Sequence, residues 1–324
     1  MTEVGILGTG AQVPDRVVSN DEAGAAAGVD DAWVVRKTAI RERRWAAPEQ
    51  ATSDLAAAAG SAALRSAGIT PDQLSVIVVA TSTPDRPQPP TAAYVQQLLG
   101  AVGAAAFDVN AVCSGEVFAL AAAEGILTRR GGHALVIGAD VYSRILNPAD
   151  RRTVVLFGDG AGAMVLGPGR GARVRNLALH TFGELAGLIE VPAGGSRRPA
   201  DQAALDAGLQ YFTMDGRAVR SFVEDRLPLL TKQFLHDSGV GPDDIRHFVP
   251  HQANGVMLDA LFAELALNRA VMHRTLTHYG NTGAASIPIT LAEAARSGAF
   301  RPGDLILLAG FGGGMAVGFA LVEW

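Results

Sequence analysis

Short apolar runs alternate with longer segments of mixed character along the 324 residues of the chain. A run of apolar or β-branched residues bounded by turn residues is typical of a buried strand, whereas apolar positions recurring every three or four residues are typical of a helix. In the first half this pattern predicts strands at 4–7, 74–80, 104–109, 134–137 and 163–166, and helices at 53–67, 91–99 and 114–129. In the second half it predicts helices at 215–238, 254–265 and 284–299, and strands at 245–249, 305–308 and 316–322.

Strands and helices alternate throughout, which predicts an α/β fold whose sheets are covered by helices on both faces. An irregular stretch rich in Gly, Arg and Pro interrupts the pattern at 193–204. The predicted strands and helices follow one another in a similar order before and after residue 170. This similarity suggests two pseudo-duplicated halves, 1–170 and 171–324.

The composition excludes several classes of protein. With 48% hydrophobic and 18% charged residues, the chain is too apolar to be disordered, and its single Cys excludes a disulfide scaffold. A net charge of −5 argues against a nucleic-acid partner. No apolar run is long enough to span a membrane, and the first residues lack the pattern of a signal peptide. We therefore expect a cytoplasmic protein that binds neither membrane nor nucleic acid.

Cys113 is the first candidate for chemistry, because it stands where a predicted strand ends and a long helix begins. The positive end of a helix dipole and the free amides at a helix N-terminus lower the pKa of a thiol there and favour the nucleophilic thiolate. A small buried side chain at the same position is an equally good interpretation.

Three further positions are each ambiguous when taken alone. His251 follows a predicted strand and could line a pocket or be an ordinary histidine, and Asn281 lies in a turn, where Asn is common. The run 311–314, Phe-Gly-Gly-Gly, could present backbone amides to an oxyanion or form a flexible turn.

Other motifs can be set aside. The pair His247 and His251 has a spacing that suits a metal site on a helix, but Val249 and Pro250 make the segment extended, so no metal site is expected. The segment 8–10, Gly-Thr-Gly, lacks the third glycine of a dinucleotide fingerprint, and 157–162 lacks the Lys and Ser/Thr of a P-loop.

Taken in order, Cys113, the segment 251–254 (His-Gln-Ala-Asn), the segment 280–282 (Gly-Asn-Thr) and the run 311–314 resemble β-ketoacyl-acyl carrier protein synthase III over essentially the whole chain. The segment 33–43, from Trp to Arg, belongs to the same resemblance. It implies a thiolase-like fold, in which two pseudo-duplicated halves form five layers, α-β-α-β-α. The N-terminal half would carry the cysteine and the C-terminal half the histidine and asparagine.

The resemblance also implies a mechanism. Cys113 would take an acyl group from a thioester, and the amides of Cys113 and Gly313 would form the oxyanion hole. His251 and Asn281 would donate hydrogen bonds to a malonyl-type thioester while it loses carbon dioxide, to give a 3-ketoacyl product. The thioester is itself the electron sink, so no metal or organic cofactor is expected. Asn rather than Asp at position 281 favours decarboxylative condensation.

By the same resemblance, Trp33 and Arg151 would hold the adenine end of coenzyme A, with Lys37 beside them, and Asn254 would contact the pantetheine arm. The expected partners are an acyl-coenzyme A or acyl-carrier protein, a malonyl-carrier protein and a second copy of the chain in a homodimer. Two departures affect this site. Lys37 replaces the usual Arg and loses its planar fork of donors, and Val256 replaces a basic residue that helps to dock the carrier.

The expected acyl pocket consists of Gln88, Glu116, Tyr142, Phe157, Ile189 and Phe212, with Gln88 reaching across the dimer interface. Gln88, Glu116 and Tyr142 depart from the family pattern, which suggests a polar or specialised acyl group and a role in a polyketide pathway. Two alternatives remain open: acyl transfer to a hydroxyl, amine or carrier thiol without decarboxylation, and a catalytically silent scaffold.

Overall fold

The computed structural model describes residues 4–169 and 171–324, and in this part of the chain ten strands form one continuous sheet. The first half contributes β1 (Gly5–Gln12), β4 (Leu74–Ala80), β5 (Ala105–Val109), β6 (His133–Asp140) and β7 (Gly160–Gly167). The second half contributes β8 (Ala172–Thr181), β11 (Ile245–Pro250), β12 (Val271–Met272), β13 (Leu305–Gly312) and β14 (Ala316–Glu323).

The two halves of the sheet have the same topology. Their spatial orders are β1-β7-β6-β4-β5 and β8-β14-β13-β11-β12, so corresponding strands occupy corresponding places. In each half the three strands farthest from the junction are parallel and the other pairs are antiparallel. The halves meet between β1 and β8 through only two residue pairs, which lets the sheet open into two layers. We infer that the chain contains two duplicated halves.

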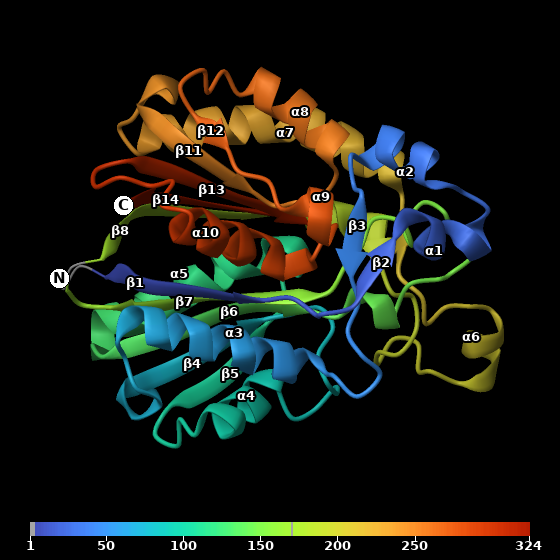
Figure 1. Cartoon of the computed structure of the whole chain (residues 1–324), viewed down its shortest axis with the longest axis horizontal. Helices are drawn as coiled ribbons and strands as arrows, with labels where there is room; N and C mark the ends of the chain where they lie inside the picture. Colours follow the sequence, from blue (N-terminus) through green and yellow to red (C-terminus); the bar gives the residue numbers. More distant parts are fainter. Residues whose placement is uncertain (1–3, 170) are drawn as a thin grey trace.

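Helices separate and cover these two layers of sheet (Figure 1). Helices α3 (Thr52–Ala67) and α4 (Thr91–Leu99) pack on the outer face of the first half, and α7 (Gly216–Asp237) and α8 (Gly255–Glu264) on that of the second. Helices α5 (Gly115–Arg130) and α10 (Ser286–Arg296) lie between the layers and contact strands of both halves. The result is the five-layered thiolase-like arrangement.

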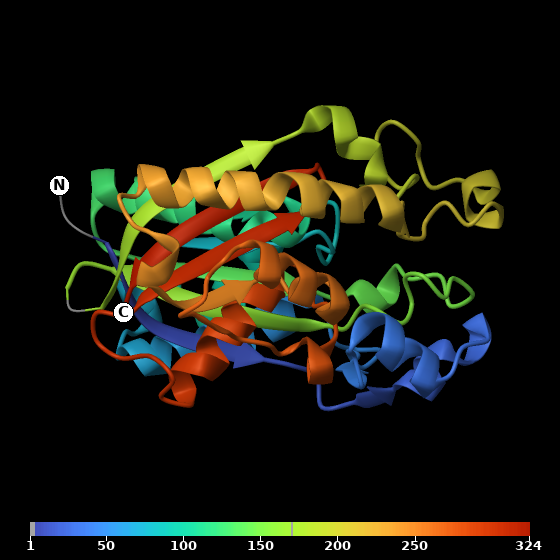
Figure 2. The ribbon, with the colours of Figure 1, turned by 90° about the horizontal axis from the view of Figure 1, so that it is seen from above.

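The remaining elements gather at the end of the molecule opposite the two chain termini, as Figures 1 and 2 show. They are α1 (Asn20–Gly24), α2 (Asp31–Thr38), α6 (Gln202–Asp206), α9 (Leu276–Tyr279) and the short strand pairs β2–β3 (Val17–Ser19 with Glu42–Arg44) and β9–β10 (Ile189–Glu190 with Thr213–Met214). Most of the irregular stretch 193–204 belongs to this end.

The sequence pattern missed β8 and α2, and it shortened β1, β6, β7 and β13. It also missed the short elements β2, β3, β9, β10, β12, α1, α6 and α9. Strand β8 alternates apolar residues with Arg173, Arg175 and Asn176, so it lacks a continuous apolar run. Helix α2 is only eight residues long and half exposed. The Gly-Thr-Gly of 8–10 lies inside β1, where the missing side chains let the backbone of α3 approach closely.

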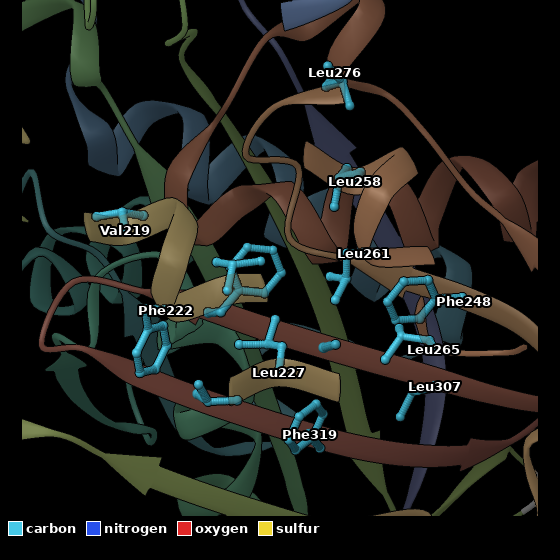
Figure 3. Close-up of a cluster of buried hydrophobic side chains, with 14 of the residues drawn as sticks. Val219, Phe222, Leu227, Phe248, Leu258, Leu261, Leu265, Leu276, Leu307 and Phe319 are labelled. Atoms are coloured by element: carbon cyan, nitrogen blue, oxygen red, sulfur yellow. The ribbon is translucent and has the colours of Figure 1, made fainter. Parts of the chain in front are cut away.

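Three apolar clusters fill the spaces between the layers. One lies between the first half of the sheet and α3–α4, a second surrounds α5 and α10, and the third joins the second half of the sheet to α7 and α8. Figure 3 shows members of the third, with Phe248 and Leu307 from the sheet facing Leu227 of α7 and Leu261 of α8. Because α5 packs on both sides, it is apolar nearly all round. Among the described residues, no helix combines the length and apolar character needed to cross a membrane.

Candidate active site

Both halves contribute to a cavity of about 750 Å³ at the end of the molecule where the small elements gather. Its lining includes Cys113 from the first half together with His251 and Asn281 from the second. The three residues lie far apart in the sequence, and each stands where a strand or turn leads into the next element.

Cys113 sits in a tight 3₁₀ turn directly before α5. The preceding residue, Val112, has a φ of 48°, a left-handed conformation that is rare for a β-branched residue. Strand β13 passes so close that a Cβ at Gly312 would lie 2.7 Å from the Cβ of Cys113. The turn is therefore held rigidly against the sheet.

The ionisation of Cys113 differs from the sequence-based expectation. The side chain is buried, and burial together with the carboxylate of Asp140 raises the pKa of the thiol above its ordinary value. The helix N-terminus opposes this effect but acts on a group that water scarcely reaches. The resting residue is thus a neutral thiol, and the expectation of a lowered pKa is wrong.

His251 leaves the end of β11 with its backbone nitrogen bonded to the carbonyl of Ala309 at 2.8 Å. Its Nδ1 lies 2.7 Å from the Oγ of Ser286, at the start of α10. The ring is buried against Phe311, and burial lowers the pKa of His251 to about 3. His251 is therefore a neutral imidazole at physiological pH.

Asn281 is fixed by backbone bonds to a neighbouring segment of the first half. Its nitrogen donates to the carbonyl of Leu156 at 2.8 Å, and its carbonyl accepts from Gly158 at 3.0 Å. The side-chain Oδ1 accepts from the nitrogen of Gly283 at 2.9 Å. These bonds orient the carboxamide and leave its NH₂ group available to the cavity that Asn281 lines.

The glycines of 312–314 have distinct positions. Gly312 lines the cavity, whereas Gly313 packs against Val112 and Ile189, where an added Cβ would come within 3.1 to 3.3 Å of their side chains. Gly313 follows the last paired residue of β13, in the turn that leads into β14.

The four residues expected to bind coenzyme A all line the cavity. The guanidinium of Arg151 lies 5.9 Å from the ring centre of Trp33. The side chain of Asn254 is already engaged, because its Oδ1 caps α8 by accepting from Val256 and its Nδ2 donates to the carbonyl of Lys37. The lining also contains three further cations, Arg152, Arg217 and Arg220.

The expected acyl-pocket residues fall into three groups. Phe157, Ile189 and Phe212 line the cavity. Tyr142 is outside the lining and stacks behind Phe157, with ring centres 4.4 Å apart. The other two residues, Gln88 and Glu116, do not line this cavity. Gln88 lies on an exposed loop of its own chain.

The position of Glu116 contradicts the expected acyl pocket most clearly. Its side chain is fully buried at the start of α5, over Gly138 of β6, and not in the cavity lining. Both carboxyl oxygens lack a hydrogen-bond partner in the described part of the chain, and burial raises the pKa of Glu116 well above its ordinary value. Glu116 therefore provides no evidence for a polar acyl group.

Arg43 was singled out only as part of the motif 33–43, yet it is fully buried beside the site. Its guanidinium donates to the carbonyl of Val155 at 2.7 Å and to Oδ1 of Asn20 at 2.8 Å, and Asn20 in turn donates to Asp31 of α2. Only the three-dimensional structure reveals this contact, because more than a hundred residues separate Arg43 from Val155 in the sequence.

Elsewhere, His247 pairs with His273 at 2.9 Å and with Asp304 at 3.2 Å, away from the cavity lining. Across residues 4–169 and 171–324, no group of three or more His, Cys, Asp or Glu side chains is arranged to hold a metal ion.

Comparisons with known proteins agree with the fold and the motifs. The family model 3-oxoacyl-[acyl-carrier-protein] synthase III matches residues 107–183, and the model of that family's C-terminal part matches residues 235–324. The acetoacetyl CoA synthase NphT7 of Streptomyces sp. strain CL190 is 73% identical over 322 residues, covering 98% of both chains. The β-ketoacyl-[acyl-carrier-protein] synthase III of Caldanaerobacter subterraneus is 41% identical, over 99% of this chain and 97% of the relative.

Solved structures give the same result. The 3-oxoacyl-[acyl-carrier-protein] synthase III of Aquifex aeolicus superposes with a TM-score of 0.88 at 34% identity, covering 99% of this chain and 100% of the other. The priming β-ketosynthase of the R1128 polyketide pathway has a TM-score of 0.91 at 31% identity, covering 99% and 96%. The chain therefore belongs to the 3-oxoacyl-[acyl-carrier-protein] synthase III family, and it is an acyltransferase that condenses an acyl group with a malonyl-type thioester with loss of carbon dioxide.

Proposed function

We propose that this enzyme transfers an acetyl group from coenzyme A to Cys113 and condenses it with a malonyl thioester to give an acetoacetyl thioester. The observation that carries the proposal is that Cys113, His251 and Asn281 all line the same cavity. The name of the 73% identical relative, an acetoacetyl CoA synthase, supports the choice of acetyl.

In the first step the sulfur of Cys113 attacks the acyl carbonyl, and the coenzyme A thiol leaves with the proton that the cysteine gives up. The amide of Cys113 lies in the 3₁₀ turn directly before α5, and the amide of Gly313 lies in the turn after β13. We assign both to the oxyanion hole, where fixed donors stabilise the tetrahedral intermediate.

In the second step His251 and Asn281 act as two neutral donors to the malonyl carbonyl. Ser286 Oγ accepts from the nitrogen of Gln252, and we assign its own proton to Nδ1 of His251. This leaves Nε2 as the protonated ring nitrogen, and the NH₂ of Asn281 is the second donor. Negative charge that appears on the carbonyl oxygen as carbon dioxide leaves is stabilised by both, so no metal or organic cofactor takes part in this proposal.

The acyl end of the cavity suits a small group. Phe157 and Phe212 line it with their ring centres 5.0 Å apart, and Tyr142 packs against both from behind. These three packed rings leave little room for a long acyl chain. We therefore replace the expectation of a polar, specialised acyl group, which relied on Gln88, Glu116 and Tyr142, because none of these three residues lines the cavity.

The cavity rim suits the phosphates of coenzyme A. Lys37, Arg151 and Arg217 are exposed there, and Val256 presents an apolar surface that is 44% exposed where a carrier-docking cation was expected. We propose that coenzyme A delivers the acetyl group and also carries the malonyl extender, with a carrier protein as the weaker alternative.

A homodimer is supported by one edge of the sheet. Strand β5 is the last strand at that edge, and the nearby Leu98 and Val102 are 55% and 87% exposed. Open strand edges and exposed apolar side chains favour pairing with another chain. The single free cysteine fits a reducing compartment, so we propose that the reaction takes place in the cytoplasm.

The test is intact-protein mass spectrometry after mixing with acetyl-, butyryl-, 3-hydroxybutyryl- and octanoyl-coenzyme A. We expect the acetyl adduct to form fastest and to be absent in Cys113→Ala. Faster labelling by the hydroxylated or the long chain would contradict the proposed substrate, and no adduct with any donor would contradict coenzyme A delivery.

The condensation step is tested by adding labelled malonyl-coenzyme A to the acetylated enzyme and measuring released carbon dioxide. We expect release to fall about 100- to 1,000-fold in His251→Ala and Asn281→Ala, whereas His236→Ala, on the exposed face of α7, serves as the control. Acyl transfer without release of carbon dioxide would contradict condensation, and release only with a malonyl-carrier protein would contradict the proposed extender.

A further inference from the structure

The short segment 281–286 holds one of the two malonyl-carbonyl donors directly and the other through a serine. The Oδ1 of Asn281 accepts from the nitrogen of Gly283 at 2.9 Å, and the Oγ of Ser286 lies 2.7 Å from Nδ1 of His251. Asn281, Gly283 and Ser286 are buried, and a 3₁₀ turn between them continues into α10. A displacement of this turn would therefore disturb both donors.

Asp140, the last residue of β6, holds this turn from the other half of the chain. Its Oδ2 accepts from the nitrogen of Ala284 at 2.8 Å, next to the amide that orients Asn281. The carboxyl group is fully buried and does not line the cavity. A Cβ at Gly283 would lie 2.2 Å from the same Oδ2. The turn is thus both bonded to and packed against one side chain of the first half.

The other oxygen of Asp140 is held within the first half. Oδ1 accepts from the nitrogens of Ser82 at 2.8 Å and Thr83 at 3.1 Å, and from the hydroxyl of Thr83 at 2.8 Å. Burial raises the pKa of Asp140, and the bonds from Ala284 and Ser82 oppose this shift. Backbone amides can only donate, so they favour the ionised carboxylate. A carboxylate accepts at both oxygens, whereas a carboxamide of the same shape accepts at only one.

We propose that Asp140 is a positioning residue for the condensation step, because it holds the segment 281–286 and with it the two donors to the malonyl carbonyl. This inference rests on the proposed role of those donors, Asn281 and His251. It adds a side chain that the family resemblance did not include. Cys113 lies in a separate turn before α5, so loss of the contact should slow condensation and spare acylation.

The charge of Asp140 separates this role from an electrostatic one. Together with burial, the carboxylate raises the pKa of the Cys113 thiol, so its removal should leave acylation as fast or make it faster. A negative charge beside the site also disfavours the enolate that forms as carbon dioxide leaves, so removal of the charge alone would speed condensation. Slower condensation would therefore report displaced donors rather than the lost charge.

The experiment measures the two half-reactions separately in the wild type and in Asp140→Asn, which keeps the shape but replaces one acceptor by an NH₂ group. Acetylation of Cys113 by acetyl-coenzyme A is followed by intact-protein mass. Release of labelled carbon dioxide is then measured after the acetylated enzyme is mixed with malonyl-coenzyme A. We expect acetylation at least as fast as in the wild type and release about 10- to 100-fold slower, because displaced catalytic groups cost rates of this order.

Asp159→Asn is the matched control. Asp159 is equally buried, and its carboxyl group accepts from the nitrogens of Ala46 at 2.7 Å and Ser143 at 2.9 Å, both in the first half. We expect this variant to change the two half-reactions by the same factor. A difference between the half-reactions as large as that in Asp140→Asn would overturn the proposal, as would equal effects of Asp140→Asn on both.

A second variant keeps the test decisive if Asp140→Asn folds poorly. Gly283→Ala leaves Asp140 and its bonds to Ser82 and Thr83 in place and pushes the turn away from the carboxylate. We expect the same selective loss of carbon dioxide release, and release at the wild-type rate would overturn the proposal. A wild type that takes up no acetyl group would refute the proposed function and this inference with it, whereas an active wild type with equal effects of Asp140→Asn on both steps refutes the inference alone.

Discussion

Replacing Glu116 by Gln tests whether the fold holds a protonated carboxyl group in its interior. The side chain is fully buried, and neither oxygen has a hydrogen-bond partner among the described residues. Burial raises the pKa of Glu116 well above its ordinary value, so the folded protein keeps the proton at pH values where the unfolded chain, with a pKa of about 4.3, has released it.

The sign of the pH dependence follows directly. A carboxyl with a raised folded pKa binds more protons in the folded than in the unfolded state, so it lowers stability as pH rises above about 4.3, until the folded group also ionises. Within this window the cost grows by about 1.4 kcal/mol for each pH unit. Glu116→Gln keeps the shape and removes the titration, so its gain in stability over the wild type should grow with pH at that slope.

The assay is urea unfolding of both proteins at pH 5, 6, 7 and 8, where the difference between the two at each pH isolates this one group. Glu124→Gln, a partly buried carboxylate on the same helix, is the control and should change stability by no more than about 0.5 kcal/mol. A difference that does not vary with pH would show that Glu116 is ionised beside an unrecognised partner, and the reasoning would be refuted.

Three further predictions concern other parts of the fold. Gly312→Ala would place a Cβ 2.7 Å from that of Cys113, so we expect acylation about 100-fold slower by stopped-flow, whereas Gly103→Ala, with open space around it, should match the wild type. Arg43→Met leaves at least two buried acceptors unpaired, and urea unfolding should show a loss of about 3 kcal/mol or more; a smaller loss would mean that water replaces the guanidinium. The pKa of His273 is lowered to about 4 by burial and by His247, so its contribution to stability is lost as pH falls from about 6.5 to 4; His273→Asn should flatten that part of the urea-midpoint curve, and an unaltered curve would contradict this.

The amino-acid sequence alone was enough for the class of fold and for the three principal site residues. Buried strands such as β4 and helices such as α4 were predicted with their observed bounds, because apolar runs and turn residues act locally. The order of Cys113, His251 and Asn281 along the chain, each in its own motif, carried the family resemblance that the comparisons then showed.

The tertiary structure decided everything that depends on burial or on contacts between distant segments. The pattern of letters around Cys113 indicated a helix N-terminus, but only the packed interior reveals that burial outweighs it and leaves a neutral thiol. Glu116 follows the nucleophile in sequence, yet its side chain lies over Gly138 and is absent from the cavity lining, a placement set by how α5 packs between the two layers of sheet. The bonds from Arg43 to Val155 and from Tyr142 to Ser82 join segments that no local pattern relates, because long-range contacts are set by how the layers pack.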